Sequence, residues 1–394
     1  FANESILLKG ARIFGFERIT EALQQKTHET VLEIDLNALV HNLNYYRSKL
    51  EPSVKVMGMV KAFSYGSGSY EIANVLQFHQ VDYLTVAYAD EGVELRKAGI
   101  KLPIMVMNPE DESFDAIIKY QLEPEIYSFR VLKMLEATLL RLSVNSHPVG
   151  IHLKIDTGMH RLGFDPVEVD ELINQLKDRS QIRIKSVFSH LAASDSPAND
   201  DFTRHQVSLF RMISDRICSE FDYPILRHIA NTAAITRFPE AQFDMVRLGI
   251  GLYGIAPMPD EQEKLQNVST LRSIISQIKH VPAEDTIGYN RRYKAKNDTT
   301  IAIVPIGYAD GLSRALSNGI GHLKVRGKFA PIVGSICMDM TMIDITCINA
   351  HEGDEVIIFG KDLPITRLAD EMGSIPYEIL SGISQRVKRV YVRG

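Results

Sequence analysis

A lysine ends an apolar segment near the start of the chain. The segment VMGMV (56–60) has the uninterrupted apolar character of a strand covered on both faces, and Lys61 follows it directly, ahead of a loop rich in Gly, Ser and Tyr. Burial lowers the pKa of a lysine, and a neutral amine can form a Schiff base with an aldehyde cofactor such as pyridoxal phosphate. Most lysines instead keep the ammonium group in water, so the residues around Lys61 decide between the two interpretations.

Further polar residues stand at the ends of later apolar segments. They are Lys154, Asp156, Arg161, His190, Asn231, Thr232, Arg247 and Gly249. Parallel strands bring their carboxyl ends together at one face, where barrels of the (β/α)8 type carry their working residues. We therefore expect these side chains to gather around Lys61.

Two of the loops at that face could bind the phosphate of such a cofactor. They read ANTAA (230–234) and RLGIGLYG (247–254), and the second contains three glycines, which allow close approach of the backbone to a ligand. Taken alone this is a weak signal, because loops are generally rich in glycine.

Eight apolar segments, many separated by helical patterns, predict an α/β fold with a (β/α)8 barrel. The helical pattern is clearest at 38–50, with Asp35 as its N-cap, and at 167–179. Pro124 makes one segment the weakest of the eight, because proline is disfavoured in a central strand. The expected strands are 56–60, 83–88, 104–107, 122–127, 150–155, 184–190, 226–230 and 245–249.

The character of the sequence changes after about residue 266. Short apolar runs alternate with Gly, Asn and Asp turns, which is typical of an all-β domain, and the polar segment 257–269 with its two prolines resembles a linker. The predicted organisation is an N-terminal extension (1–28), a barrel (29–266) and a C-terminal mostly-β domain (267–394).

Composition excludes several classes of partner. The chain has 394 residues and a net charge of -5, which favours neither nucleic acid nor an anionic membrane, and it lacks an apolar run long enough to span a bilayer. Three cysteines without metal spacing predict no metal site and favour a reducing, cytoplasmic location. The sequence begins at Phe1 without the pattern of a signal peptide, and we interpret it as a piece of a longer polypeptide.

Nine motifs, in this order, resemble the alanine racemase family. That family consists of homodimeric pyridoxal-phosphate enzymes with a (β/α)8 domain and a C-terminal β domain. Three motifs depart from the usual pattern: KAFSYGSG replaces KANAYGHG, HRLG replaces GRLG or GRIG, and ANTAA replaces ANSAA. The motifs are VMGMVKAFSYGSG (56–68), HLKIDTGMHRLG (152–163), FSHLAASD (188–195), ANTAA (230–234), VRLGIGLYG (246–254), IGYNRRY (287–293), IVPIGYADG (303–311), GSICMDMTMID (334–344) and YEILSGISQRV (377–387).

The resemblance implies that L-alanine and D-alanine are interconverted by two acid/base groups on opposite faces of Cα. Lys61 would hold the cofactor and serve one face, and Tyr289 of the partner subunit would serve the other. His190 would be the hydrogen-bond partner of Tyr289 and would connect to Arg247. An arginine stays protonated, so Arg247 would keep the pyridine nitrogen of the cofactor from gaining a proton.

The resemblance also assigns binding roles. Arg161 would hold the substrate carboxylate, and Lys154 corresponds to a lysine that is often carbamylated in the family. Asn231 lies in the ANTAA motif beside the phosphate. The phosphate-binding positions are Tyr65, Thr232, Gly249, Ile250 and Tyr377, and the positions near the substrate entrance are Tyr308, Met338 and Asp339.

Residues 3–19 of the extension resemble a different protein, the extreme C-terminus of the D-alanyl-D-alanine-adding muramoyl-tripeptide ligase. We interpret the extension as the remnant of a fusion between two enzymes of cell-wall synthesis, and the racemase would supply D-alanine for peptidoglycan. Two alternatives for the main activity stay open: a racemase for serine or for a broader range of amino acids, and a non-catalytic pyridoxal-phosphate carrier. Carriers generally lack the β domain, which IGYNRRY and GSICMDM indicate here.

Overall fold

The predicted barrel strands all form in the computed structural model, which describes residues 29–143 and 148–392. Eight parallel strands make one sheet in the order β8-β7-β6-β5-β4-β3-β2-β9. Their bounds are β2 (Lys55–Met59), β3 (Tyr83–Val86), β4 (Ile104–Val106), β5 (Glu123–Ile126), β6 (Val149–Lys154), β7 (Ile182–Phe188), β8 (Leu226–His228) and β9 (Met245–Leu248). The extension 1–28, with its resemblance to a ligase, lies outside the described residues.

The two outermost strands of this sheet approach each other through their backbones. The N–H of Asp244 donates to the carbonyl of Arg227 at 3.1 Å, and the N–H of Arg247 donates to the carbonyl of Ala230 at 3.0 Å. These bonds bring β9 against β8, so the sheet curls into the predicted barrel.

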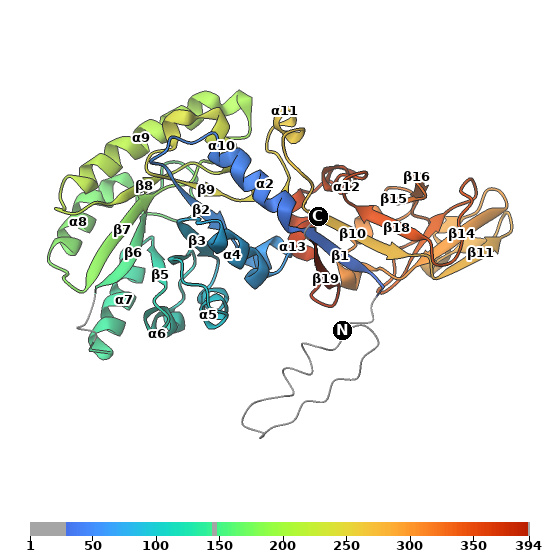
Figure 1. Cartoon of the computed structure of the whole chain (residues 1–394), viewed down its shortest axis with the longest axis horizontal. Coiled ribbons are helices and arrows are strands. Elements are labelled where there is room, and N and C mark those ends of the chain that lie inside the picture. Colours follow the sequence, from blue (N-terminus) through green and yellow to red (C-terminus); the bar gives the residue numbers. More distant parts are fainter. Residues whose placement is uncertain (1–28, 144–147, 393–394) are drawn as a thin grey trace, which may run out of the picture.

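Helices surround the barrel strands (Figure 1). The two helices predicted most clearly are confirmed with slightly different ends, and Asp35 caps the first by accepting from the N–H groups of Asn37 and Ala38. Strand β5 forms although it contains Pro124. The helices are α2 (Leu36–Arg47), α3 (Lys61–Tyr65), α4 (Ser69–Phe78), α5 (Ala89–Lys97), α6 (Phe114–Lys119), α7 (Phe129–Arg141), α8 (Val169–Lys177), α9 (Asp200–Cys218) and α10 (Thr232–Arg237).

The C-terminal domain is mostly β, as predicted, and its strands run away from the barrel, with β11 and β14 at the far end (Figure 1). A six-stranded sheet has the order β16-β15-β18-β10-β1-β19, and a three-stranded sheet has the order β11-β14-β17. The bounds are β1 (Val31–Asp35), β10 (Ser269–Ile274), β11 (Gln277–Val281), β12 (Thr286–Ile287), β13 (Tyr293–Lys294), β14 (Thr299–Val304), β15 (His322–Val325), β16 (Lys328–Pro331), β17 (Thr341–Asp344), β18 (Glu355–Phe359) and β19 (Lys388–Val392), with helices α12 (Ile365–Met372) and α13 (Pro376–Gly382).

Strand β1 connects the two domains. It stands at the start of the expected barrel range, yet it pairs with β10 and β19 in the sheet of the C-terminal domain. The segment expected as a linker contains the short helix α11 (Pro259–Gln262), and Asn42 of α2 fixes the following turn by exchanging hydrogen bonds with the backbone of Gln266. None of the helices in the described part of the chain combines the length and apolar character needed to cross a membrane.

Candidate active site

Lys61 is the first residue of α3, and one residue, Val60, separates it from the barrel strand β2. Burial lowers the pKa of its ammonium group, and the nearby cations Arg161, Lys154 and Arg247 lower it further, while Glu91 opposes them. The amine therefore loses its proton more readily than a surface lysine. This is the property that a nucleophilic lysine requires.

The backbone after Lys61 has an unusual conformation. Ala62, Phe63, Ser64 and Tyr65 all have φ between 50° and 54°, so the segment is a left-handed turn built without glycine. Each such residue costs about 1–2 kcal/mol, and strain of this kind persists only where the surroundings hold it in place.

Side chains from two other elements hold this turn. Glu91 of α5 accepts from the N–H of Ala62 at 2.6 Å. From β19, Arg389 donates to the carbonyl of Gly66 and the hydroxyl of Tyr391 donates to the carbonyl of Ser67, both at 3.0 Å. The C-terminal strand of the chain thus fixes the loop that carries Lys61.

Phe63 is one of the residues by which KAFSYGSG differs from the usual family motif, and its contacts give a reason for the difference. Its ring lies 5.5 Å from the guanidinium carbon of Arg389, within the range of a cation–π contact. The unusual residue therefore adds a contact to the arginine that fixes the loop.

Arg247 of β9 is almost fully buried among backbone carbonyls. Its Nη1 lies 2.7 Å from Nδ1 of His228, and its Nη2 donates to the carbonyls of Ser189 at 2.7 Å and Ile229 at 3.0 Å. No residue in the described ranges accepts a hydrogen bond from its Nε. One donor of a buried guanidinium is thus left for an acceptor that the protein does not itself supply.

His190, at the end of β7, lies beside Arg247. Its Nδ1 is 3.4 Å from Nη2 of Arg247, which can only donate, so the proton of the neutral ring resides on Nε2. Burial lowers the pKa of His190 to about 3, and Arg247, Arg161, Lys154 and Lys61 contribute in the same direction. The ring is therefore a neutral hydrogen-bond donor at physiological pH.

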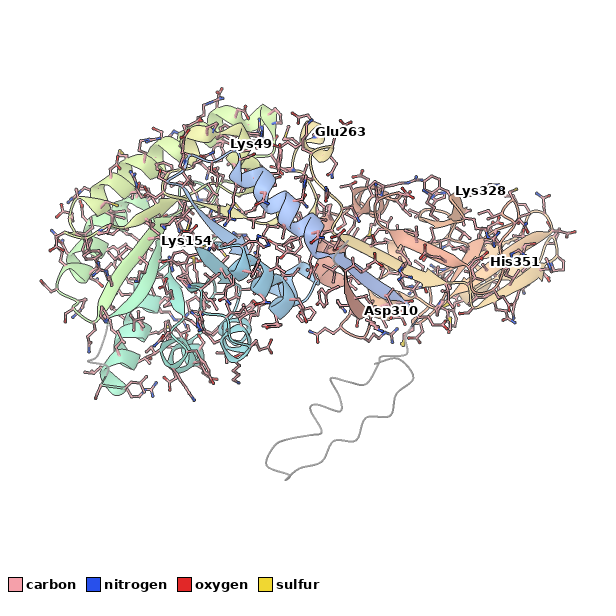
Figure 2. All side chains as sticks on the ribbon, in the orientation of Figure 1. Lys49, Lys154, Glu263, Asp310, Lys328 and His351 are labelled. Atoms are coloured by element: carbon pink, nitrogen blue, oxygen red, sulfur yellow. The ribbon has the colours of Figure 1, made fainter. Side chains whose placement is uncertain are left out.

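Lys154 lies inside the barrel, among its strands (Figure 2). Its Nζ is 2.9 Å from Oε1 of Glu125, and both side chains are almost completely buried. Burial raises the pKa of Glu125, while the charge of Lys154 opposes that shift. A carbamate on Lys154 would remove the positive charge that lies beside Glu125, so this close pair fits an unmodified lysine.

Four of the predicted phosphate-binding residues follow the carboxyl ends of β2, β8 and β9, and the fifth, Tyr377, approaches them from α13. The N–H of Gly249 donates to Oγ1 of Thr232 at 3.0 Å, which leaves the hydroxyl hydrogen of Thr232 free to donate. A Cβ on Gly249 would lie 3.2 Å from the hydroxyl of Tyr65, whose ring packs 5.6 Å from that of Tyr377. Ile250 follows directly in the chain.

Asn231 has a structural role in this group. Its side-chain oxygen accepts from the N–H of Ala234 and from the hydroxyl of Ser194, so it caps α10 and positions Thr232. The sequence placed Asn231 beside the phosphate, and the structure puts it one residue before the first turn of this short helix.

Arg161 is exposed on a loop at the same face. Asp156 shapes this loop by accepting from the N–H groups of Gly158, Met159 and His160. His160, which replaces the usual glycine, has φ of 52°, a conformation that glycine adopts at lower cost. Arg161 is thus presented to solvent near Lys61, where a carboxylate could reach it.

The remaining predicted residues lie in the C-terminal domain. Tyr289 is 69% exposed and begins a short 3-10 turn between β12 and β13, while Tyr308 and Met338 are 43% and 53% exposed. Asp339 pairs with Arg386 at 2.7 Å. Within the described part of one chain, no hydrogen bond or ring contact joins Tyr289 to Lys61 or His190.

The sequence reasoning missed three residues that shape the site. Glu125 was visible as a carboxylate inside an expected barrel strand, and this position alone is a usable signal. Glu91 and Arg389 had no such signal, because each acts on the backbone of a loop that is distant in sequence.

Comparisons with known proteins agree on one family. Residues 34–257 match the family model described as "Alanine racemase, N-terminal domain", and residues 268–391 match "Alanine racemase, C-terminal domain". The chain is 38% identical over 373 residues to "Alanine racemase 2" of Caldanaerobacter subterraneus subsp. tengcongensis, covering 92% of this chain and 95% of that protein. It is also 38% identical to the alanine racemase of Sorangium cellulosum, covering 92% and 98%.

Solved structures give the same result. An alanine racemase of Clostridium difficile 630 has a TM-score of 0.86 and 37% identity, with coverage of 94% of this chain and 97% of that chain. An alanine racemase from Bartonella henselae with covalently bound pyridoxal phosphate has a TM-score of 0.84 and 27% identity, with coverage of 92% and 99%.

Proposed function

This chain belongs to the alanine racemase family, and we propose that it interconverts L-alanine and D-alanine with pyridoxal 5'-phosphate bound at Lys61. The single observation that carries the proposal is the environment of Lys61, a half-buried amine at the working face of a barrel among three cationic side chains. We further propose that the D-alanine serves peptidoglycan synthesis and that the enzyme works in the cytoplasm.

The residues at this face fit the cofactor. Lys61 would supply an amine for its aldehyde. Its phosphate would be held by residues that contact one another at this face or follow directly in the chain: Tyr65, Thr232, Gly249, Ile250 and Tyr377. The Nε of Arg247 supplies a donor for the pyridine nitrogen. When bound, pyridoxal phosphate delocalises the negative charge that is left on Cα of an amino acid after its proton is removed.

Arg247 sets the protonation at the far end of the cofactor site. Burial lowers its pKa to about 10, with Arg161 contributing and Glu125 opposing, so the guanidinium keeps its charge at neutral pH. A protonated arginine can only donate a hydrogen bond, so Arg247 would keep the pyridine nitrogen that it faces from gaining a proton of its own. The charge on Cα is then stabilised less strongly, which disfavours side reactions.

Lys61 would serve as acid or base for one face of Cα through its free amine. Its lowered pKa brings proton exchange closer to neutral pH. Arg161, exposed near Lys61, offers a planar pair of donors to the substrate carboxylate. This contact would orient Cα between Lys61 and Tyr289.

Tyr289 serves the opposite face, and we propose that it comes from a second copy of this chain. The exposure of Tyr289, Tyr308 and Met338 in a single chain supports this arrangement, because a second copy of the chain could cover them. His190, with its proton on Nε2, would donate to the phenol oxygen and stabilise the phenolate.

An absorption spectrum and a racemisation assay test the proposal together. We expect a visible band of the protein-bound cofactor that borohydride removes, and conversion of L-alanine to D-alanine. Lys61→Ala should abolish both. Equal or faster turnover of L-serine would indicate a different substrate range, and a bound cofactor without turnover of any amino acid would indicate a carrier.

A further inference from the structure

A continuous chain of hydrogen bonds crosses the interior of the barrel from Arg247 to Glu123. Nη1 of Arg247 is 2.7 Å from Nδ1 of His228, and Nε2 of His228 is 2.8 Å from Oγ of Ser186. The same oxygen is 2.7 Å from Nδ1 of His152, and Nε2 of His152 is 2.9 Å from Oε2 of Glu123. Strands β9, β8, β7, β6 and β5 thus each contribute one member in spatial order.

The chemistry of the two ends fixes the direction of every bond. A guanidinium can only donate, so Nδ1 of His228 accepts and its Nε2 carries the proton. That proton is donated to Ser186, whose own hydrogen must then point to Nδ1 of His152. The remaining proton of His152, on Nε2, is donated to the carboxylate of Glu123, which as an anion can only accept.

Burial makes this arrangement costly to break. Ser186, His152 and His228 are fully buried, so each unpaired donor or acceptor among them would lack water as a substitute partner. Burial lowers the pKa of His228, and the charge of Arg247 adds to this effect, which favours the neutral ring that the chain requires.

Glu123 is held as an anion by the groups that face it. Burial would raise its pKa, but the hydrogen bond from His152, the charge of Lys185 and the hydroxyl of Tyr83 outweigh that effect, so its pKa lies below the usual value. Arg96 of α5 adds a further positive charge in its vicinity.

We propose that Glu123 is a positioning residue for Arg247. By fixing the direction of each hydrogen bond in the chain, Glu123 determines which donors of Arg247 are engaged. The inference rests on the proposed function, in which Arg247 faces the cofactor. The carboxylate anchors the acceptor end, so Nδ1 of His228 always presents a lone pair to Nη1 of Arg247. With this nitrogen and Nη2 both engaged, Nε is the donor that remains for the cofactor.

Neutron diffraction on crystals of the wild-type holoenzyme tests the direction of the chain without reference to activity. We expect deuterium on Nε2 of both His152 and His228, and the Ser186 hydroxyl pointing to His152. Deuterium on Nδ1 of either histidine would overturn the proposal. This result is the same whichever amino acid the enzyme racemises, so failure of the proposed function would be recognised separately.

A double-mutant cycle tests the control of Arg247. Glu123→Gln keeps the shape and an acceptor but removes the charge, whereas Ser186→Ala interrupts the chain in its middle. Each should lower kcat by about 2- to 30-fold with little change in KM, and the double variant should lose no more than the worse single variant. Glu220→Gln, which removes a partly buried carboxylate paired with Lys177 and Arg216 outside the barrel, is the control.

Two outcomes of the cycle would overturn the proposal. One is an additive loss in the double variant, since independent sites do not share a chain. The other is a loss in Glu123→Gln no larger than that in the control. If Glu123→Gln does not fold, the wild-type neutron structure and Ser186→Ala decide the question.

Discussion

Arg389 donates from Nε to the backbone carbonyl of Gly66 at 3.0 Å, although 323 positions separate the two residues. The same guanidinium also donates to the carbonyls of Ile383, Ser384 and Val387. One side chain in the last strand therefore joins the C-terminal segment to the left-handed turn that carries Lys61.

The first prediction concerns this contact. Arg389→Ala should lower the free energy of unfolding by about 2–4 kcal/mol, because several partly buried carbonyls lose a charged donor. It should also weaken cofactor retention, since the strained turn loses one of its supports. Chemical denaturation and cofactor release on dialysis measure the two effects.

Arg272→Ala is the matched control. Arg272 lies in the same sheet, and its side chain forms ion pairs at 3.4 Å and 3.5 Å to partly exposed carboxylates, so its loss should cost less than about 1 kcal/mol. Equal losses in the two variants would show that Arg389 does not have the role described.

The second prediction uses the pKa of His190, which is about 3 in the folded protein. In the unfolded chain His190 has an ordinary pKa of about 6.5, so below that pH it gains a proton that the folded protein does not bind. Protonation therefore favours the unfolded state, and His190 lowers the free energy of unfolding as pH falls below about 6.5. Between pH 7.5 and pH 5 the effect reaches about 2 kcal/mol.

His190→Asn should remove that part of the acid sensitivity. We expect the free energy of unfolding of the variant to fall by about 2 kcal/mol less than that of the wild type over this pH range. Parallel curves for the two proteins would mean that His190 is protonated in the folded state.

The third prediction concerns Lys154, whose Nζ lies 2.9 Å from a carboxylate oxygen of the buried Glu125. We expect Lys154 to remain an unmodified amine in bicarbonate buffer, because the buried carboxyl of Glu125 would lose its positively charged partner in a carbamate. Carbon-13 NMR of enzyme equilibrated with labelled bicarbonate should show no carbamate resonance. A resonance that disappears in Lys154→Gln would contradict this expectation.

The barrel was predictable because its parallel strands are covered on both faces and therefore appear as uninterrupted apolar runs. Pro124 weakened one of these predictions, yet β5 formed at the expected place. The left-handed turn after Lys61 gave no sequence signal, because none of its four residues is glycine.

The pairing of strands that are distant in the sequence could not be predicted either. Strand β1 lies beside β10 and β19, whose residues are more than 230 positions away, and no local pattern assigns it to their sheet. The chain through His152, Ser186 and His228 depends on which side chains point into the barrel. That fact follows from strand register and not from composition.

The central claim is that each active site takes Lys61 from one chain and Tyr289 from another. Mixed dimers of the separately inactive Lys61→Ala and Tyr289→Phe variants test it most directly, after unfolding and refolding together. If sites are shared, each mixed dimer contains one site with both residues intact, and random mixing restores about one quarter of the wild-type activity. Mixtures that stay as inactive as the separate variants would contradict the account, since both residues would then belong to one chain.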